Sequence, residues 1–242
     1  MNEALPLLIR QRLQRTLERI AEAARSCGRD PSEVRLVVVT KSQPLEIARM
    51  AVAAGATRLG ENYPEEAVEK IAALRQNSEV EWHMIGHVQS RKADLVAKDF
   101  AMLHALDSLR LAARLERGCQ ERGRILPVLI EVNVSGEESK YGLPAWDEAH
   151  WEDLLPELEG LAGFPCLKVQ GLMTMPPFFA DAEGSRPYFR RMRRLQQFLI
   201  DRLPRLGWQE LSMGTSADYP VAVQEGATYV RVGQAILGPR PA

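Results

Sequence analysis

A lysine that follows a short apolar run is the first residue in this sequence whose type and position suggest chemistry. Lys41 comes directly after residues 35–40, a run dominated by leucine and valine. Poor solvation and nearby cations lower the pKa of a lysine, and the neutral amine attacks a carbonyl to form a Schiff base. The alternative is a solvated lysine at the start of a loop.

Two later segments have the composition of an anion-binding site. They are Ser212-Met213-Gly214-Thr215-Ser216 and Arg231-Val232-Gly233. Backbone N–H groups at a helix start bind phosphate, and Gly233 allows a ligand to approach the backbone closely. The alternatives are that Ser216 only caps a helix and that Arg231 forms a structural ion pair. With the lysine, these segments predict a ligand carrying a phosphate and a carbonyl, such as pyridoxal 5′-phosphate (PLP) or a phosphosugar.

Alternating strands and helices must position these residues. The expected strands cover residues 35–40, 58–61, 81–85, 102–106, 127–134, 168–174, 210–213 and 228–232. The expected intervening helices cover residues 44–54, 65–74, 91–98, 108–122, 146–161, 187–203 and 217–225. Such alternation implies parallel strands, and eight units in about 250 residues are typical of a barrel whose active site lies at the carboxyl ends of the strands.

The sequence therefore predicts an α/β fold, a (β/α)8 TIM-like barrel with an extra N-terminal helix. We expect a single domain over residues 1–242, with the helix in 1–28 and the barrel in 35–238. A doubly wound open sheet is the rival, but no GxGxxG motif follows the first strand.

Composition excludes several classes of protein. The 31 Lys and Arg residues against 32 Asp and Glu give a net charge of -1, which argues against a nucleic-acid partner. The three cysteines lie far apart, without zinc-ligand spacing, so we expect no metal and a reducing, cytoplasmic compartment. No apolar run approaches the roughly 20 residues that span a membrane, and no secretory signal is present.

Seven ordered motifs resemble a known family. They are Thr40-Lys41-Ser42, Leu59-Gly60-Glu61-Asn62-Tyr63, Trp82-His83-Met84-Ile85-Gly86, Val132-Asn133-Val134 with Ser139-Lys140, Gly171-Leu172-Met173, Leu211-Ser212-Met213-Gly214 and Val230-Arg231-Val232-Gly233. In this order they resemble the pyridoxal phosphate homeostasis proteins, which are stand-alone relatives of the alanine racemase N-terminal barrel. The resemblance runs over residues 35–238.

The resemblance implies PLP as the cofactor and a role for each matching residue. Lys41 would hold PLP as an internal aldimine, and Arg231 would face its pyridine nitrogen. The phosphate would lie among Ser212, Gly214, Ser216, Gly233 and the backbone of Gln234. The pocket would be lined by Asn62, His83 and Met173, with Ser139 and Lys140 on a nearby loop.

Three positions depart from the family pattern. Gln234 stands where the family often has threonine, so one hydroxyl contact to the phosphate is missing. Gln43 stands where a second lysine often follows, which puts in doubt any role of that lysine in cofactor transfer. His87 replaces a usual proline.

The sequence favours a carrier over an enzyme. A carboxylate beside the pyridine nitrogen assists electron-sink catalysis, whereas Arg231 in that place would weaken it. The related racemases also use a second domain, and only residues 237–242 follow the last strand region here. We expect a monomeric, non-catalytic protein that binds PLP in vitamin B6 homeostasis, with PLP-dependent apoenzymes as candidate partners. The alternatives are a PLP-dependent amino-acid racemase or lyase and a Schiff-base phosphosugar aldolase.

Two other groups of residues receive structural interpretations. His83 and His87 are four residues apart, but no cysteine or aspartate cluster accompanies them, so core or loop histidines are expected rather than a metal site. The arginines between residues 186 and 205 indicate a solvated outer helix, with docking to an acidic partner as the alternative.

Overall fold

A closed ring of parallel strands forms the centre of the molecule in the computed structural model, which describes residues 4–77 and 79–240. The expected ranges 1–28 and 1–242 therefore include residues outside the described part. The barrel strands are β1 (Arg35–Val39), β2 (Arg58–Glu61), β3 (Glu81–Met84), β4 (Met102–Leu106), β5 (Leu126–Asn133), β7 (Leu167–Met173), β8 (Glu210–Ser212) and β9 (Tyr229–Val232). The ring closes because β4 pairs with β5 and β1 pairs with β9, and every pairing is parallel. The predicted single-domain barrel is confirmed.

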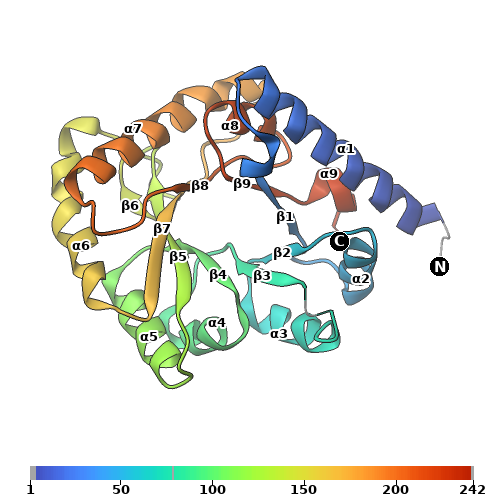
Figure 1. Ribbon diagram of the computed structural model, residues 1–242, viewed down its shortest axis with the longest axis horizontal. Coiled ribbons are helices and arrows are strands. Elements are labelled where there is room, and N and C mark those ends of the chain that lie inside the picture. The colour runs from blue at the N-terminus through green and yellow to red at the C-terminus, as the bar shows by residue number, and fades with distance from the viewer. Residues whose placement is uncertain (1–3, 78, 241–242) are drawn as a thin grey trace.

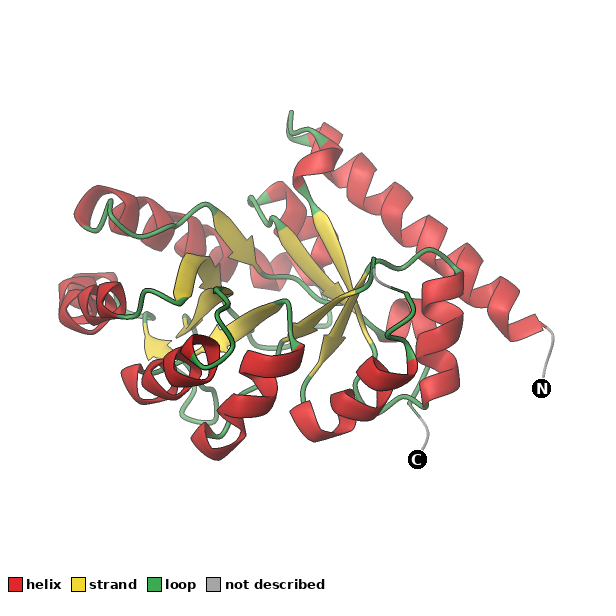
Figure 2. Cartoon of the chain, turned by 60° about the horizontal axis from the view of Figure 1, so that its bottom comes forward, coloured by secondary structure: helices red, strands yellow, loops and turns green. Residues whose placement is uncertain are grey.

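Helices surround the strands, as Figure 1 shows. They are α1 (Ala4–Ser26), α2 (Leu45–Ala53), α3 (Pro64–Ala73), α4 (Ala93–Asp99), α5 (Leu109–Gln120), α6 (Leu155–Gly160), α7 (Arg186–Arg202), α8 (Tyr219–Gln224) and α9 (Gln234–Leu237). Short 3-10 helices are η1 (Pro31–Glu33), η2 (Ser90–Lys92), η3 (Glu148–Leu154), η4 (Leu161–Gly163) and η5 (Ala182–Ser185). Helix α1 packs on the outside of the barrel against α2, α8 and α9 (Figures 1 and 2).

The apolar strand runs bury side chains on both of their faces, as expected for strands inside a ring of helices. Val37 and Val38 in β1 are 0% and 1% exposed, although they point to opposite sides of the strand. Gly171 in β7 is required for strand packing, since a Cβ there would lie 1.9 Å from the carbonyl oxygen of Glu210 in β8. Within residues 4–77 and 79–240, no helix combines the length and apolarity needed to cross a membrane.

Several small elements, among them the 3-10 helices η1 and η5, were not predicted. Strand β6 (Leu143–Pro144) pairs with the end of β5, and helix α9 follows β9. The region expected as one helix over 146–161 is divided into η3 and α6. These differences leave the predicted order of the eight barrel strands unchanged.

Candidate cofactor site at the barrel mouth

Lys41 lies at the mouth of the barrel, two residues beyond the end of β1, and is partly buried. Burial lowers the pKa of Lys41, and the positive charges of Arg240 and Arg231 lower it further. The negative charge of Glu61 acts in the opposite direction. The neutral amine is therefore more available at a given pH than in an exposed lysine. The structure gives Lys41 the two conditions expected from the sequence, desolvation and neighbouring cations.

A buried ion pair fixes the residue before this lysine. Glu61 is 0% exposed, and its Oε1 accepts hydrogen bonds from Lys70 Nζ at 2.8 Å and Thr40 Oγ1 at 2.7 Å. Lys70 Nζ also donates to the carbonyl oxygen of Thr40 at 2.8 Å. Sequence reasoning missed this pair, although Glu61 stood in a quoted motif and Lys70 lies on the buried face of α3.

Replacing Lys70 by methionine is expected to destabilise the fold by about 3 kcal/mol, because it leaves Glu61 buried without its cation. The double replacement Glu61→Gln with Lys70→Met should recover much of that loss, since no uncompensated charge remains. Urea unfolding of the three proteins measures both effects. Equal stability of the single and double variants would contradict the interpretation.

A chain of hydrogen bonds crosses the inside of the barrel beneath the mouth. Arg231 Nη1 donates to Ser212 Oγ, which lies 2.8 Å from His104 Nδ1. His104 Nε2 in turn lies 2.8 Å from His83 Nδ1. We assign the hydroxyl of Ser212 as donor to His104 Nδ1, which places the proton of each histidine on Nε2; that of His83 lies on the side of Glu81 Oε2, 3.9 Å away. Burial lowers the pKa of both histidines, which favours these neutral forms.

Arg231 is a buried cation whose hydrogen-bond acceptors are neutral. It is 3% exposed, and Nη2 donates to the carbonyl oxygen of Thr174 and to Sδ of Met175, each at 2.8 Å. Burial lowers the pKa of Arg231 to about 10, so it stays charged at neutral pH. Within the described residues it forms no ion pair. The expected alternative of a structural ion pair is therefore wrong, and the negative charges of Glu131 and Asp218 act on Arg231 without a direct contact.

The two small-residue segments meet beside the end of β1. The hydroxyl oxygen of Ser216 accepts hydrogen bonds from the backbone N–H of Gly233 at 3.3 Å and of Ala235 at 3.4 Å. The N-cap position of α8 is held by Asp218 instead. The alternative that Ser216 caps this helix is therefore wrong. Its hydroxyl instead accepts hydrogen bonds at the start of α9.

Glycines keep this region compact. Gly214 has a φ of 91°, and a Cβ there would lie 2.5 Å from Cβ of Ala222. At Gly233 a Cβ would lie 3.0 Å from the carbonyl oxygen of Val39. A cavity of about 280 Å³ elsewhere is larger, but the hollow here, about 210 Å³, lies at the ends of β1 and β9. Its lining residues are Val39, Gln43, Gly233, Gln234, Gly238, Pro239 and Arg240.

The remaining predicted pocket residues have different positions. Asn62 follows β2 and packs against Gly86, where a Cβ would lie 2.8 Å from Cα of Asn62. Met173 ends β7 and is 1% exposed. His83 lies deeper, in the hydrogen-bond chain beneath Arg231. The structure thus places Asn62 and Met173 at strand ends, and His83 inside the barrel.

The loop after β5 is attached on two sides of the mouth. Lys140 Nζ donates to the carbonyl oxygen of Met175 at 2.8 Å, next to β7. Tyr141 stacks on His87 with ring centroids 4.1 Å apart, and His87 Nδ1 lies 2.7 Å from Asp107 Oδ2. The histidine that departs from the family pattern therefore supports this loop. No cluster of metal-binding side chains occurs among the described residues.

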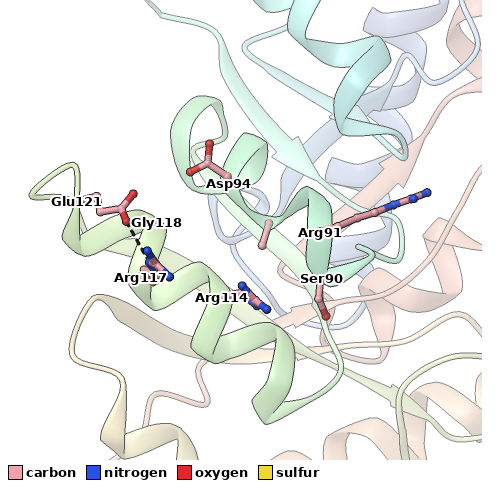
Figure 3. A pocket seen from close by; sticks show the side chains of 8 residues that line it. Ser90, Arg91, Asp94, Arg114, Arg117, Gly118 and Glu121 are labelled. Carbon is pink, nitrogen blue, oxygen red and sulfur yellow. Dashed lines mark hydrogen bonds and ion pairs between the residues drawn. The ribbon is translucent and has the colours of Figure 1, made fainter.

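The larger cavity lies on the outside of the barrel between η2, α4 and α5. Arg91, Arg114, Arg117, Asp94 and Glu121 are among its lining residues. Figure 3 shows Arg117 paired with Glu121 and the side chain of Arg91 extending away from them. None of these residues lines the hollow at the ends of β1 and β9, so this cavity is separate from the candidate site.

The arginines of α7 are held mainly by carboxylates of the same chain. Arg186, Arg190 and Arg193 converge on the buried Glu225. Arg194 pairs with Glu148 in the same region of the surface. This geometry agrees with the outer-helix interpretation and gives no sign of an unpaired docking surface in these residues.

Comparison with known proteins assigns the family. The family model for the alanine racemase N-terminal domain matches residues 10–241. Proteins named pyridoxal phosphate homeostasis protein match at 40% identity in Pseudomonas aeruginosa, covering 96% of both chains, and at 37% in Aquifex aeolicus, covering 95% of this chain and 97% of that one. The chain belongs to the pyridoxal phosphate homeostasis protein family.

A solved structure extends this comparison to the fold and to a ligand. PipY of Synechococcus elongatus is 36% identical, with a TM-score of 0.79, and covers 92% of this chain and 99% of PipY. Its structure is described both with PLP bound and without PLP. Alanine racemase of Clostridium difficile, at 15% identity and a TM-score of 0.65, shares the barrel fold. A protein that is similar to this chain over most of its length has thus been solved with PLP bound.

Proposed function

We propose that this chain binds PLP at the barrel mouth, with Nζ of Lys41 as the attachment point, and acts in vitamin B6 homeostasis as a cytoplasmic carrier without turnover. The whole of residues 1–242 would serve as one binding domain. Family membership and the PLP-bound structure of PipY support the ligand. The free cysteines Cys27, Cys119 and Cys166 are compatible with a reducing compartment.

The buried charge of Arg231 is the observation that carries this proposal. Burying a charge without an ion-pair partner is unfavourable, so such a residue is expected to serve a ligand. Arg231 lies inside the end of the barrel where Lys41 is located, and its positive charge lowers the pKa of Lys41. PLP, with a ring nitrogen, a phosphate and an aldehyde, has groups that suit Arg231, the glycine-rich segments and Lys41. The residues present therefore fit the cofactor.

Each part of the site has a separate task. Bound PLP supplies an aldehyde, to which the neutral amine of Lys41 adds with loss of water. Ser216 holds the segments of Gly214 and Gly233 together by accepting the N–H of Gly233, and the backbone N–H groups of Gly214 and Gln234 are the proposed phosphate donors. Gln43 is 7% exposed and bonds the carbonyl oxygen of Pro239 at 3.4 Å, so it supports the cavity wall.

The proton positions beside Arg231 support a carrier. Arg231 donates and cannot accept, so it keeps a pyridine nitrogen unprotonated, which weakens electron withdrawal by the ring. His104 and His83 lie beneath it in their neutral forms and supply no further charge. This side of the site stabilises a bound ring without promoting reaction at an attached substrate. We further propose that the protein transfers bound PLP to PLP-dependent apoenzymes.

The first experiment is the visible absorption spectrum of the purified protein with PLP, before and after borohydride. We expect a yellow band that borohydride removes, with the pyridoxyl group then found on Lys41 by peptide mass spectrometry. Absence of the band after incubation with PLP, together with cleavage of a phosphosugar, would favour an aldolase. Sustained turnover of an amino acid that requires Lys41 would favour a racemase or lyase.

A further inference from the structure

Glu131 is a buried acid that the proposed binding scheme does not use. It lies in β5 and is 8% exposed, and its backbone pairs with Met173 of β7. The preceding residue, Ile130, lines a small hollow with Leu109 and Leu158 on the helix side of the strand. Because side chains alternate along a strand, Glu131 points into the barrel.

One oxygen of this carboxyl group has no partner. Oε2 of Glu131 is buried and makes no hydrogen bond. The loop that carries Gly142 covers the strand here, since a Cβ at Gly142 would lie 2.7 Å from the carbonyl oxygen of Glu131. An unpaired buried oxygen is costly, and protonation or a ligand relieves that cost.

Two charged groups act on Glu131 from neighbouring elements. Asp107, which follows β4, disfavours its ionisation, and Arg231 of β9 favours it. Asp107 is itself bonded to His87, at 2.7 Å. Burial is the largest effect, and it raises the pKa of Glu131 to about 7. Arg231 gives its hydrogen bonds to neutral acceptors, so Glu131 interacts with it through charge alone.

We propose that Glu131 is the proton-exchange residue of the pocket: its carboxylate offsets the charge of Arg231 in the ligand-free protein, and it takes up a proton when an anionic ligand enters beside that arginine. This inference rests on the proposed PLP binding. The ligand and the carboxylate compete for one positive charge in a poorly solvated space. Glu131 would thereby make cofactor retention depend on pH.

The direction of the pH dependence follows from linkage. A bound anion raises the pKa of Glu131 above its ligand-free value, so binding consumes protons near and above neutral pH. Affinity is therefore greatest below about pH 7 and falls as the pH rises through the window between the two pKa values. A rise of one unit in that pKa corresponds to a loss of about tenfold in affinity across the window.

The experiment measures PLP binding by wild type and Glu131→Gln between acidic and alkaline pH, with calorimetry in buffers of different ionisation heat. We expect the wild type to take up more protons than the variant, and its affinity to fall about tenfold relative to the variant as the pH rises. Glu121→Gln, at an exposed position directly after α5, is the matched control and should behave as wild type.

One further readout, an NMR titration, helps to separate the possible outcomes. NMR titration of labelled glutamate in the folded wild type should show Glu131 titrating near neutrality, and higher after PLP is added. Equal proton uptake by wild type and Glu131→Gln would overturn this inference alone. Failure of the wild type to bind PLP would overturn the proposed function and this inference together.

Discussion

Replacement of Lys41 by alanine is expected to abolish the yellow band and all borohydride-fixed PLP. Lys41 is the lysine whose pKa is lowered by burial at the barrel mouth, so its amine is neutral at lower pH than that of an exposed lysine. The phosphate and Arg231 contacts remain, and weak non-covalent binding should persist. We expect a loss of about a hundredfold in affinity, which corresponds to about 2.8 kcal/mol.

Two other lysines provide the comparison. Lys140 lies near the mouth but is held by Glu137 and the carbonyl oxygen of Met175, whereas Lys98 is exposed on α4. Lys98→Ala should keep the full band. In the Lys41→Ala protein, mass spectrometry after borohydride should find no pyridoxyl group on Lys140. A fixed cofactor on Lys140, or an unchanged band, would show that the attachment point is assigned wrongly.

The strand order was predictable because its signals are local. Apolar runs such as that of β1 are buried on both sides in a barrel, and glycines end several of the helices. Helix α9 has four residues, too few to show a helical period, and β6 is defined only by its pairing with β5. Both depend on contacts with distant residues, so neither has a local sequence signature.

The residues of the candidate site also fall into two groups, those with a local sequence signal and those without one. Lys41, Ser212 and Arg231 were found from residue type and from their expected places at strand ends. Ser216 had no such signal, since N-cap preference is a local rule and its actual partners, Gly233 and Ala235, lie at the start of another helix, α9. Sequence spacing could not identify such partners, because they are set by how the barrel closes.

Two buried glutamates show most clearly what the sequence alone could not predict. Glu61 and Glu131 look alike in sequence, each near the end of a predicted strand. The structure gives Glu61 a buried lysine as partner, whereas Glu131 has an oxygen without any hydrogen bond. Their difference arises from long-range packing. A functional interpretation of either required the positions of β4, β9 and α3.

Replacement of Arg231 by methionine is expected to separate binding from stability. The variant loses a donor to bound PLP, and a hydrogen bond that involves a charged group contributes about 1.5–3 kcal/mol, so affinity should fall about tenfold to a hundredfold. The free energy of unfolding should change by less, about 1 kcal/mol or below. Removal of a buried charge without an ion pair relieves a desolvation cost, which offsets the lost bond to the carbonyl of Thr174.

Urea unfolding of the ligand-free protein and fluorescence titration with PLP measure the two quantities. Arg231→Lys should retain part of the affinity, since it keeps the charge without the planar fork of donors. A large loss of stability with unchanged PLP affinity would assign Arg231 a structural role only. Removal of the arginine also takes away the charge that lowers the pKa of Glu131. Glu131 should then be protonated at neutral pH even without ligand, so Arg231→Met should take up fewer protons on binding PLP than the wild type.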